Sequence, residues 1–263
     1  MNHFYRPLRL LLLFVLANVH FPIIHAQFIT TVAGGIGNDT AAIPYCRTTN
    51  PSTVVCDAAG NIYFSDMTLG TAAWRVLNPV TGKIKTFPTG GQGVFDATGN
   101  WYFVSGPVVM KRSVSGALTT VAGNGSTTYS GDGGSALLAG MNPSDVGVDA
   151  AGNIYICDRN NRRIRKVTTA GVISTVAGTG LSGSTGDGGP ALTATFTNPV
   201  SIYVEPGGGI YVSDQSAGRI RYVSPGGIIS TIAGGGSSYS DGGPATAASL
   251  SSPGLVRGSL AGE

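Results

Sequence analysis

A cassette of strand-like segments recurs along this chain. One copy reads Asp-Ala-Ala-Gly-Asn-Ile-Tyr-Ile-Cys-Asp at 149–158, Arg-Ile-Arg-Lys-Val at 163–167 and Gly-Val-Ile-Ser-Thr-Val-Ala-Gly at 171–178. The pattern returns 56 residues later, where Gly208 repeats Gly152. A fixed period of this size indicates a repeat architecture in which each unit packs against its neighbours.

Each unit predicts four short strands. Apolar and polar residues alternate with period two, and turns that contain glycine interrupt the alternation. In the copy quoted above, the predicted strands are 146–148, 153–157, 163–167 and 172–176. No helical segment separates them, so each unit forms one small sheet. Such sheets bury their faces by radial packing, and the predicted fold class is an all-β β-propeller of four-stranded blades.

The register of the repeat predicts the domain organisation of residues 27–263. Four complete blades are expected at about 52–89, 92–123, 144–178 and 200–234. The segment 28–34 repeats a fourth strand, and 253–263 begins a partial blade. This count predicts a chain that is incomplete at its C-terminus and closes by strand exchange with a missing C-terminal segment. The alternatives are a native open array and a ring completed by a second copy.

The repeated residues carry a resemblance to a known family. The pattern D-x-x-G-N-I-Y-x-x-D, then R-I-R-x-V and G-x-I-x-T-V-A-G, resembles NHL repeats. The Gly-Asp-Gly-Gly-Pro-Ala run at 186–191 is similar to tandem arrays in secreted bacterial proteins and to teneurin-type surface proteins. The resemblance implies a propeller over nearly all of 27–263. It implies no single activity, because NHL propellers serve as scaffolds, RNA binders, sensors and occasionally enzymes.

Residues 1–26 predict a signal peptide. Arg6 and Arg9 precede a short apolar run, and the small residue Ala26 favours cleavage before Gln27. A membrane anchor is the alternative, but the apolar run falls short of the ~20 residues that span a bilayer. We therefore expect a secreted, cell-surface or periplasmic protein with no integral membrane segment after cleavage. Without those two arginines the chain has 14 basic and 13 acidic residues, so no nucleic-acid partner is predicted.

The histidines restrict the chemistry of the exported chain. The three histidines, His3, His20 and His25, all lie within 1–26. Ser-His-Asp catalysis and histidine metal ligation are thereby excluded from the rest of the chain. We predict a protein that is not an enzyme and uses no cofactor. Carboxylates can still act as acids and bases, so a histidine-free hydrolase or lyase is the third hypothesis.

The recurring acids are interpreted as structural, because a position repeated in every blade serves the blade. Asp132 and Asp187 lie instead in Gly-Asp-Gly-Gly linkers, and Asp241 lies in a matching Ser-Asp-Gly-Gly linker. These three are weak calcium candidates, with one acid per loop. Cys46 and Cys56 could form a disulfide in an oxidising compartment. The alternative for Cys56 is a small core residue. The acids interpreted as structural are Asp57, Asp66, Asp96, Asp149, Asp158, Glu205 and Asp214.

Long loops on a rigid scaffold are the expected binding surface. In an antiparallel blade, the loop between strands two and three lies at the same end as the interblade linker. The predicted site is the loop formed by Arg159, Asn160, Asn161, Arg162 and Arg163, for which a solvated edge is the alternative. We predict a non-catalytic extracellular scaffold that binds a protein. The alternative is a glycan- or small-ligand-binding module of a longer adhesin-like protein, although Trp74 and Trp101 fit blade packing better than a sugar platform.

Overall fold

The computed structural model describes residues 54–56, 60–66, 73–78, 80–87, 93–239 and 241–258. These residues form β-strands, short 3-10 helices and turns. The strands pair into four antiparallel sheets of four strands, and neighbours in each sheet are consecutive in the chain. The predicted all-β fold with four-stranded sheets is confirmed.

The sheets are numbered in chain order. The first contains β1 (Val54–Cys56), β2 (Ile62–Asp66), β3 (Ala73–Asn78) and β4 (Lys83–Phe87), and the second β5 (Gly93–Phe95), β6 (Trp101–Ser105), β7 (Val108–Arg112) and β8 (Leu118–Ala122). The third contains β9 (Pro143–Val148), β10 (Ile154–Asp158), β11 (Arg163–Val167) and β12 (Ile173–Ala177), and the fourth β13 (Pro199–Val204), β14 (Ile210–Asp214), β15 (Arg219–Val223) and β16 (Ile229–Gly234).

Three linkers follow the second, third and fourth sheets. The first linker is 123–142, the second is 178–198, and the third is 235–252 apart from residue 240. Each contains a 3-10 helix, respectively η2 (Ala136–Leu138), η4 (Ala191–Thr193) and η6 (Ala245–Ala247). The linkers therefore repeat together with the sheets that they connect.

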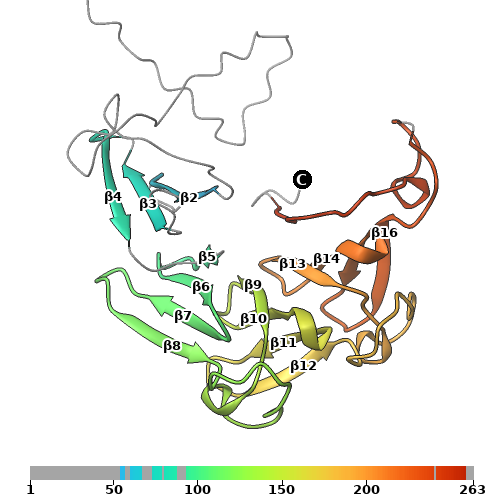
Figure 1. Cartoon of the computed structure of the whole chain (residues 1–263), viewed down its shortest axis with the longest axis horizontal. Helices are drawn as coiled ribbons and strands as arrows, with labels where there is room; N and C mark the ends of the chain where they lie inside the picture. Colours follow the sequence, from blue (N-terminus) through green and yellow to red (C-terminus); the bar gives the residue numbers. More distant parts are fainter. Residues whose placement is uncertain are drawn as a thin grey trace, which may run out of the picture.

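The sheets follow one another around a common centre (Figure 1). Their first strands β5, β9 and β13 lie on the inner side, and the fourth strands lie on the outer side (Figure 1). β9 packs against both β5 and β13. This radial arrangement is that of a β-propeller. β9 begins at Pro143, earlier than the predicted Val146, because a proline is tolerated as the first residue of a strand.

Acidic residues close the first hairpins of the second, third and fourth sheets. The backbone and side-chain nitrogens of Asn153 donate to Asp149 Oδ1 and Oδ2, each at 2.8 Å. Gly152 has a φ of 83°, in the left-handed region where a side chain would be strained. Glu205 takes the place of Asp149 in the fourth sheet and accepts from the Tyr211 hydroxyl at 2.9 Å. These contacts confirm a structural role for Asp149 and Glu205.

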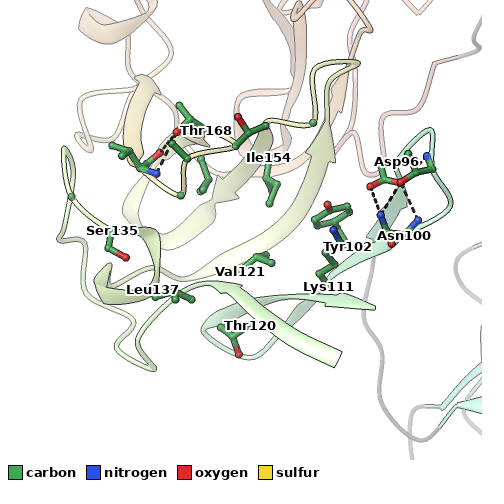
Figure 2. Close-up of a pocket in the computed structure, with 18 residues that line it drawn as sticks. Asp96, Asn100, Tyr102, Lys111, Thr120, Val121, Ser135, Leu137, Ile154 and Thr168 are labelled. Atoms are coloured by element: carbon green, nitrogen blue, oxygen red, sulfur yellow. Dashed lines mark hydrogen bonds between the residues drawn. The ribbon is translucent and has the colours of Figure 1, made fainter. Parts of the chain in front are cut away.

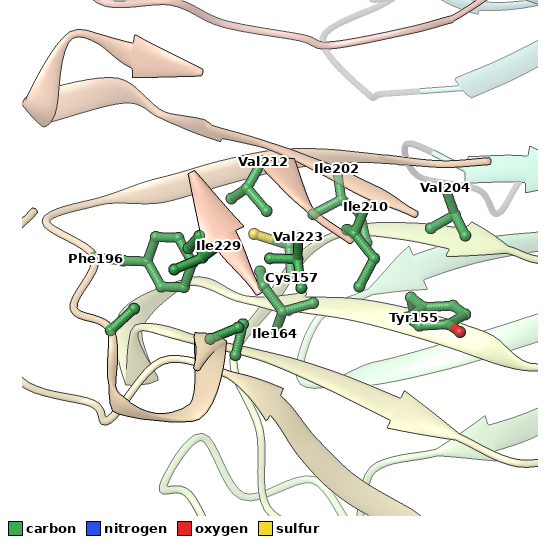
Figure 3. Close-up of a cluster of buried hydrophobic side chains, with 13 residues drawn as sticks. Tyr155, Cys157, Ile164, Phe196, Ile202, Val204, Ile210, Val212, Val223 and Ile229 are labelled. Carbon is green, nitrogen blue, oxygen red and sulfur yellow. The ribbon is translucent and has the colours of Figure 1, made fainter. Parts of the chain in front are cut away.

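A hydrophobic core lies between the third and fourth sheets (Figure 3). Cys157 and Ile164 contribute from one side, Ile202 and Val212 from the other, and Phe196 of the second linker closes the cluster; all are at most 1% exposed. Burial of an aliphatic or aromatic side chain of this size stabilises a fold by ~1.5–3 kcal/mol. Burial also raises the pKa of the Cys157 thiol well above its ordinary value.

Aromatic side chains fill the boundary between the first and second sheets. Trp74 and Trp101 are 3% and 2% exposed, and their ring centroids lie 4.9 Å apart. Phe103 of the same cluster packs against Trp101, with ring centroids 4.6 Å apart and the ring planes tilted by 33°. The prediction that both tryptophans serve blade packing is confirmed.

The described part of the predicted partial blade, 253–258, forms no strand. Its contacts to the fourth sheet use side chains instead of a backbone ladder: Ser213 Oγ donates to Pro253 O at 2.8 Å, and Val256 N donates to Ser201 Oγ at 3.1 Å. A strand requires a hydrogen-bonded neighbour, and these contacts provide none. The predicted signal peptide, the strand at 28–34 and the Cys46–Cys56 pair lie outside the residues and side chains that the structure describes.

A membrane-spanning helix would need a long apolar run. Among the described residues, no helix of the required length and hydropathy occurs.

Candidate functional site

Two cavities open at the turn ends of the strands, one on each side of the turn 96–100. The main groove, between the second and third sheets, has a volume of about 760 Å³. The side groove, between the first and second sheets, has about 580 Å³. Both volumes are typical of ligand sites. Thr98 lines both grooves, so together they form one surface across three sheets.

One carboxylate holds the turn 96–100 in place. Asp96 Oδ1 accepts from the backbone N–H groups of Thr98 and Asn100, each at 2.9 Å. The Thr98 hydroxyl donates to the same oxygen at 2.8 Å, and Asn100 Nδ2 donates to Asp96 Oδ2 at 2.8 Å. Burial opposes ionisation, but the hydrogen bonds from Asn100 and Thr98 outweigh it and hold the pKa of Asp96 below its ordinary value. Asp96 is therefore a charged group that serves the turn.

A lysine and a tyrosine line the main groove next to this turn. Tyr102 on β6 is buried, and Lys111 Nζ on β7 lies 5.4 Å from the Tyr102 ring centroid. The third sheet repeats the contact, with Lys166 Nζ at 5.1 Å from the Tyr155 ring centroid. An aromatic face attracts a cation. The Tyr102 ring therefore helps to position the positive charge of Lys111 in the groove (Figure 2).

The far wall of the main groove combines hydroxyl and apolar groups (Figure 2). The turn 168–172 joins β11 to β12, and Val172 N donates to Thr168 Oγ1 at 3.3 Å. Leu137 of the first linker is 50% exposed, and Val172 is 41% exposed. The groove thus offers both hydrogen-bonding and apolar contacts, as ligand sites commonly do.

Basic side chains outnumber acidic ones around the two grooves. Lys111 lines the main groove, and Lys85 and Arg112 line the side groove. Among the described residues that line them, Asp96 is the one acid. A concave surface with this charge balance attracts anionic ligands.

The predicted loop site lies at the opposite ends of the strands. Arg159–Asn161 form the 3-10 helix η3 between β10 and β11, and Arg162 follows with a φ of 51°. Arg159 Nε donates to Asn198 Oδ1 at 2.9 Å, and Arg162 Nε donates to Thr197 O at 3.3 Å. Both arginines therefore contact the second linker.

Asn161 and Arg163 of the same loop contact the linkers as well. Asn161 Nδ2 donates to Thr127 O of the first linker at 3.0 Å. Arg163 Nη2 donates to Thr179 O of the second linker at 2.6 Å, and Arg163 Cζ lies 3.8 Å from the Tyr129 ring centroid. Asn160 is exposed, as is Arg159. The loop thus joins the third sheet to two linkers, and these two exposed residues can still contact a partner.

Two of the linker acids bind buried arginines. Arg165 Nη2 and Nε donate to Asp132 Oδ1 at 2.5 and 3.0 Å. Arg221 Nη2 donates to Asp187 Oδ1 at 2.7 Å. Both arginine side chains are fully buried. Asp132 and Asp187, two of the three weak calcium candidates, therefore bind the third strand of the sheet that follows each linker. Within the described residues, no group of three metal-binding side chains is found.

A polar cluster lies on the inner strands. Asp145 of β9 is fully buried, and its Oδ2 accepts from Ser201 Oγ at 2.7 Å and from Arg257 Nη1 at 3.0 Å. Ile202 N donates to the same oxygen at 3.1 Å. The carboxylate is therefore neutralised by an arginine and shared between β9, β13 and the segment 253–258.

The sequence analysis did not predict the two grooves. Their lining comes from strands and turns of neighbouring sheets, which no sequence spacing joins. The sequence contains one signal for the main groove, the variable position x of the R-I-R-x-V motif. This position is Lys166 in the third sheet, and the strand pairing makes Lys111 and Tyr222 its counterparts in the second and fourth sheets. Variable positions in an otherwise fixed repeat are where units acquire different binding properties.

Comparisons with known proteins agree with the repeat. The family model described as NHL repeat matches residues 141–167, which span β9 to β11. Teneurin-4 of Mus musculus is 39% identical over 97 residues, covering 32% of this chain and 3% of that protein. The chain thus spans about 3% of the length of the curated relative it matches. The fold is that of a β-propeller, and the chain carries an NHL repeat in its third sheet.

Solved structures with similar folds have low sequence identity to this chain. A streptogramin B lyase structure is 17% identical with a TM-score of 0.49, covering 70% of this chain and 54% of that one. An auxiliary nutrient binding protein from Bacteroides ovatus is 14% identical with a TM-score of 0.48, covering 87% and 70%.

Proposed function

We propose that this protein is a non-catalytic extracellular scaffold that binds a segment of a protein partner along the main and side grooves. The observation that carries the proposal is the use of the acidic side chains by the fold itself. Catalytic carboxyl groups must exchange protons with a substrate or attack it. Here the carboxylates accept hydrogen bonds from neighbouring turns, linkers and strands.

The use of the acids extends over the whole described part of the chain. Apart from Asp241, every acidic side chain described there accepts a hydrogen bond from another group of the protein or forms an ion pair with it. The absence of histidine from residue 27 onward adds to this pattern. Together they support binding over catalysis. The acids concerned are Asp96, Asp132, Asp145, Asp149, Asp158, Asp187, Glu205 and Asp214.

The chemistry of the grooves favours an acidic, extended peptide. Lys111 supplies a positive charge in the main groove, and Lys85 and Arg112 add two in the side groove. Leu137 and Val172 offer apolar contacts beside them. An extended segment that places carboxylates near the basic groups and apolar side chains near the far wall would satisfy both.

The test uses a phage-displayed library of short random peptides selected on the full chain. Selected peptides are resynthesised with fluorescein, and affinity is measured by fluorescence anisotropy. We expect acidic peptides, and we expect Lys111→Glu to weaken their binding about tenfold, ~1.4 kcal/mol, because the charge in the groove is reversed. Arg159→Glu makes the same charge change at the opposite end of the strands and should leave the affinity within about twofold.

Two results would contradict the proposal. Selection of no peptide with saturable binding would exclude a peptide-binding groove. Equal loss of binding in Arg159→Glu and Lys111→Glu would show a general charge effect or a site at the loop end. Thermal unfolding of both variants must match the parent chain, so that a loss of fold is not read as a loss of contact.

A glycan-binding module is the alternative. The hydroxyl groups of Thr98, Thr120 and Thr168 line the main groove and favour it, whereas the burial of Trp74 and Trp101 removes them from a stacking surface. A glycan array probed with the full chain, and then with the Thr168→Val variant, decides between glycan binding and peptide binding. Glycan binding that Thr168→Val abolishes, with no peptide selected, would replace the peptide proposal.

A further inference from the structure

The first and second linkers hold the sheet that follows them through the same contacts. Arg165 Nη2 donates to Ser130 O at 2.8 Å, and Arg221 Nη2 donates to Thr185 O at 3.1 Å. Each of these carbonyl groups lies two residues before the linker acid. The residues before the 3-10 helices η2 and η4 also have nearly the same angles, with φ of −63° and −61° and ψ of 128° and 129°. The two linkers can therefore be compared position by position.

In the first linker, a tyrosine completes the contact with the third sheet. The Tyr129 hydroxyl donates to Asp132 Oδ2 at 2.9 Å and lies 3.5 Å from Thr175 Oγ1 of β12. Its ring packs on Arg163, whose Cζ lies 3.8 Å from the ring centroid. One phenol group thus contacts a carboxylate, a hydroxyl group and a guanidinium at the same time.

The second linker keeps those three groups but has no tyrosine. Ser184 stands at the position of Tyr129, three residues before the linker acid. The spacing and the strand pairing give the other counterparts, which are Asp187 for Asp132, Thr231 for Thr175 and Arg219 for Arg163. The groups that a phenol contacts in the first linker are therefore repeated without the phenol.

Polar atoms at this place in the second linker lack hydrogen-bond partners. Asp187 Oδ1 accepts from Arg221, but among the described residues no hydrogen bond reaches Asp187 Oδ2. Thr231 Oγ1 is buried without a partner there, as is Nε of the fully buried Arg221. The Asp187 side chain is 44% exposed, against 27% for Asp132, which the tyrosine contacts. Buried polar atoms are normally hydrogen-bonded, and in the first linker a phenol hydroxyl supplies such bonds.

The arginine that would meet the ring is held in place by the protein. Arg219 Nη1 donates to Ser184 O at 3.1 Å and to Ser184 Oγ at 3.2 Å. A Cβ added to Gly235 would overlap the Arg219 guanidinium, and one added to Gly180 would overlap that of Arg163. A glycine thus packs on each arginine in the same way. Arg163 also contacts an aromatic ring, whereas no ring of the described part of the chain contacts Arg219.

We propose that Asp187, Thr231 and Arg219 form a binding site for a phenol group, carried by a tyrosine side chain of a polypeptide or by a free phenolic compound. The phenol hydroxyl donates to Asp187 Oδ2 and accepts from the Thr231 hydroxyl, and the ring packs on the Arg219 guanidinium. Each contact repeats one that Tyr129 makes in the first linker. The three residues line neither groove, so the site lies beyond the proposed function.

The test is a titration of the isotope-labelled full chain with p-cresol, followed by the chemical shifts of the backbone amides. We expect saturable shifts in the second linker. N-acetyl-tyrosinamide carries the same phenol on a peptide unit: binding tighter than that of p-cresol assigns the site to a tyrosine side chain, and weaker binding assigns it to a free phenolic compound. N-acetyl-phenylalaninamide should bind about tenfold more weakly than N-acetyl-tyrosinamide, because it lacks the hydroxyl that bonds the carboxylate.

Three variants of the chain test the assignment to these residues. Ser184→Tyr places the chain's own phenol in the site, so it should abolish p-cresol binding and raise the melting temperature by about 2–4 °C, the effect of one added contact. Tyr129→Ser should create the same site in the first linker, so that p-cresol binds at both linkers. Ser182→Tyr is the matched control: it adds the same ring at an exposed position of the second linker and should leave p-cresol affinity within about twofold.

The absence of saturable shifts in the second linker would overturn the proposal. So would undiminished p-cresol binding in Ser184→Tyr, or an equal loss in Ser184→Tyr and Ser182→Tyr. Equal affinities for the tyrosine and phenylalanine amides would show that the hydroxyl is not recognised. Lys111→Glu, which tests the grooves, should leave p-cresol binding unchanged, so the two proposals can fail separately.

Discussion

Asp132 Oδ1 lies 2.5 Å from Arg165 Nη2, across the boundary between the first linker and the third sheet. The Arg165 side chain is fully buried, whereas that of Asp132 is 27% exposed. Asp158 Oδ2 lies 3.8 Å from Arg165 Nη1 on the other side. A buried guanidinium is tolerated only when it is neutralised and hydrogen-bonded. The pair therefore couples the position of the linker to the packing of the sheet.

Removing the linker carboxylate should destabilise the protein where an arginine depends on it. Asp132→Asn leaves Arg165 buried without its closest counter-charge, and we expect the free energy of unfolding to fall by about 1–3 kcal/mol. Asp241→Asn makes the same change at an exposed carboxylate and should stay within about 0.5 kcal/mol of the parent chain. Urea unfolding of the two variants measures the difference. Equal stabilities would show that the ion pair contributes nothing.

The free energy of unfolding at acidic pH should depend on Asp132. Burial opposes its ionisation, but hydrogen bonds from Thr175, Arg165 and Tyr129 outweigh it and lower its pKa from 3.8. A lowered folded-state pKa means that the charged form stabilises the fold above the unfolded-state pKa, and that this contribution is lost as the pH falls through the folded-state value.

The stability difference between the parent chain and Asp132→Asn should therefore be constant above about pH 5 and shrink below the unfolded-state pKa. Burial raises the pKa of Asp158, which acts in the opposite direction, and the difference between the two proteins largely removes that contribution. Urea unfolding over a pH series measures it. A difference that is independent of pH down to about 2 would contradict the assignment.

Gly131 and Gly133 should differ in their tolerance of alanine. Both have positive φ, 88° and 83°, and alanine in this region costs ~1–2 kcal/mol. A Cβ at Gly131 would also lie 2.8 Å from Ala139 Cα, whereas none of the surrounding atoms lies within 4 Å of a Cβ at Gly133. Thermal unfolding should therefore show a larger loss for Gly131→Ala. A larger loss for Gly133→Ala would mean that the linker is packed differently.

Cys157 should be unreactive in the folded protein. Its side chain is 0% exposed, and burial raises the pKa of its thiol. Because the thiolate is the reactive form, iodoacetamide should label residue 157 only after denaturation. Peptide mapping by mass spectrometry distinguishes this cysteine from the other two. Labelling under native conditions at the rate of an exposed thiol would place Cys157 outside the core.

Local residue patterns predicted the turns and strands well, because their causes are local. Gly152 and Asp149 lie within one hairpin, and their roles follow from a backbone angle and a short hydrogen bond. The binding partners of the linker acids could not be predicted from local patterns. Asp132 lies 33 residues before Arg165, and no local rule assigns such a partner, so calcium was the suggestion that their oxygen chemistry allowed.

The sequence by itself determined the repeat, the all-β class, the four-stranded sheets and the structural role of the hairpin acids Asp96, Asp149 and Glu205. Each of these depends on the alternation of residues, on turns and on a fixed period. The tertiary structure decided the grooves, the buried Asp–Arg pairs and the exposed state of Tyr239 and Asp241. These features depend on which sheet lies beside which linker, and the packing of neighbouring sheets fixes that relationship in three dimensions.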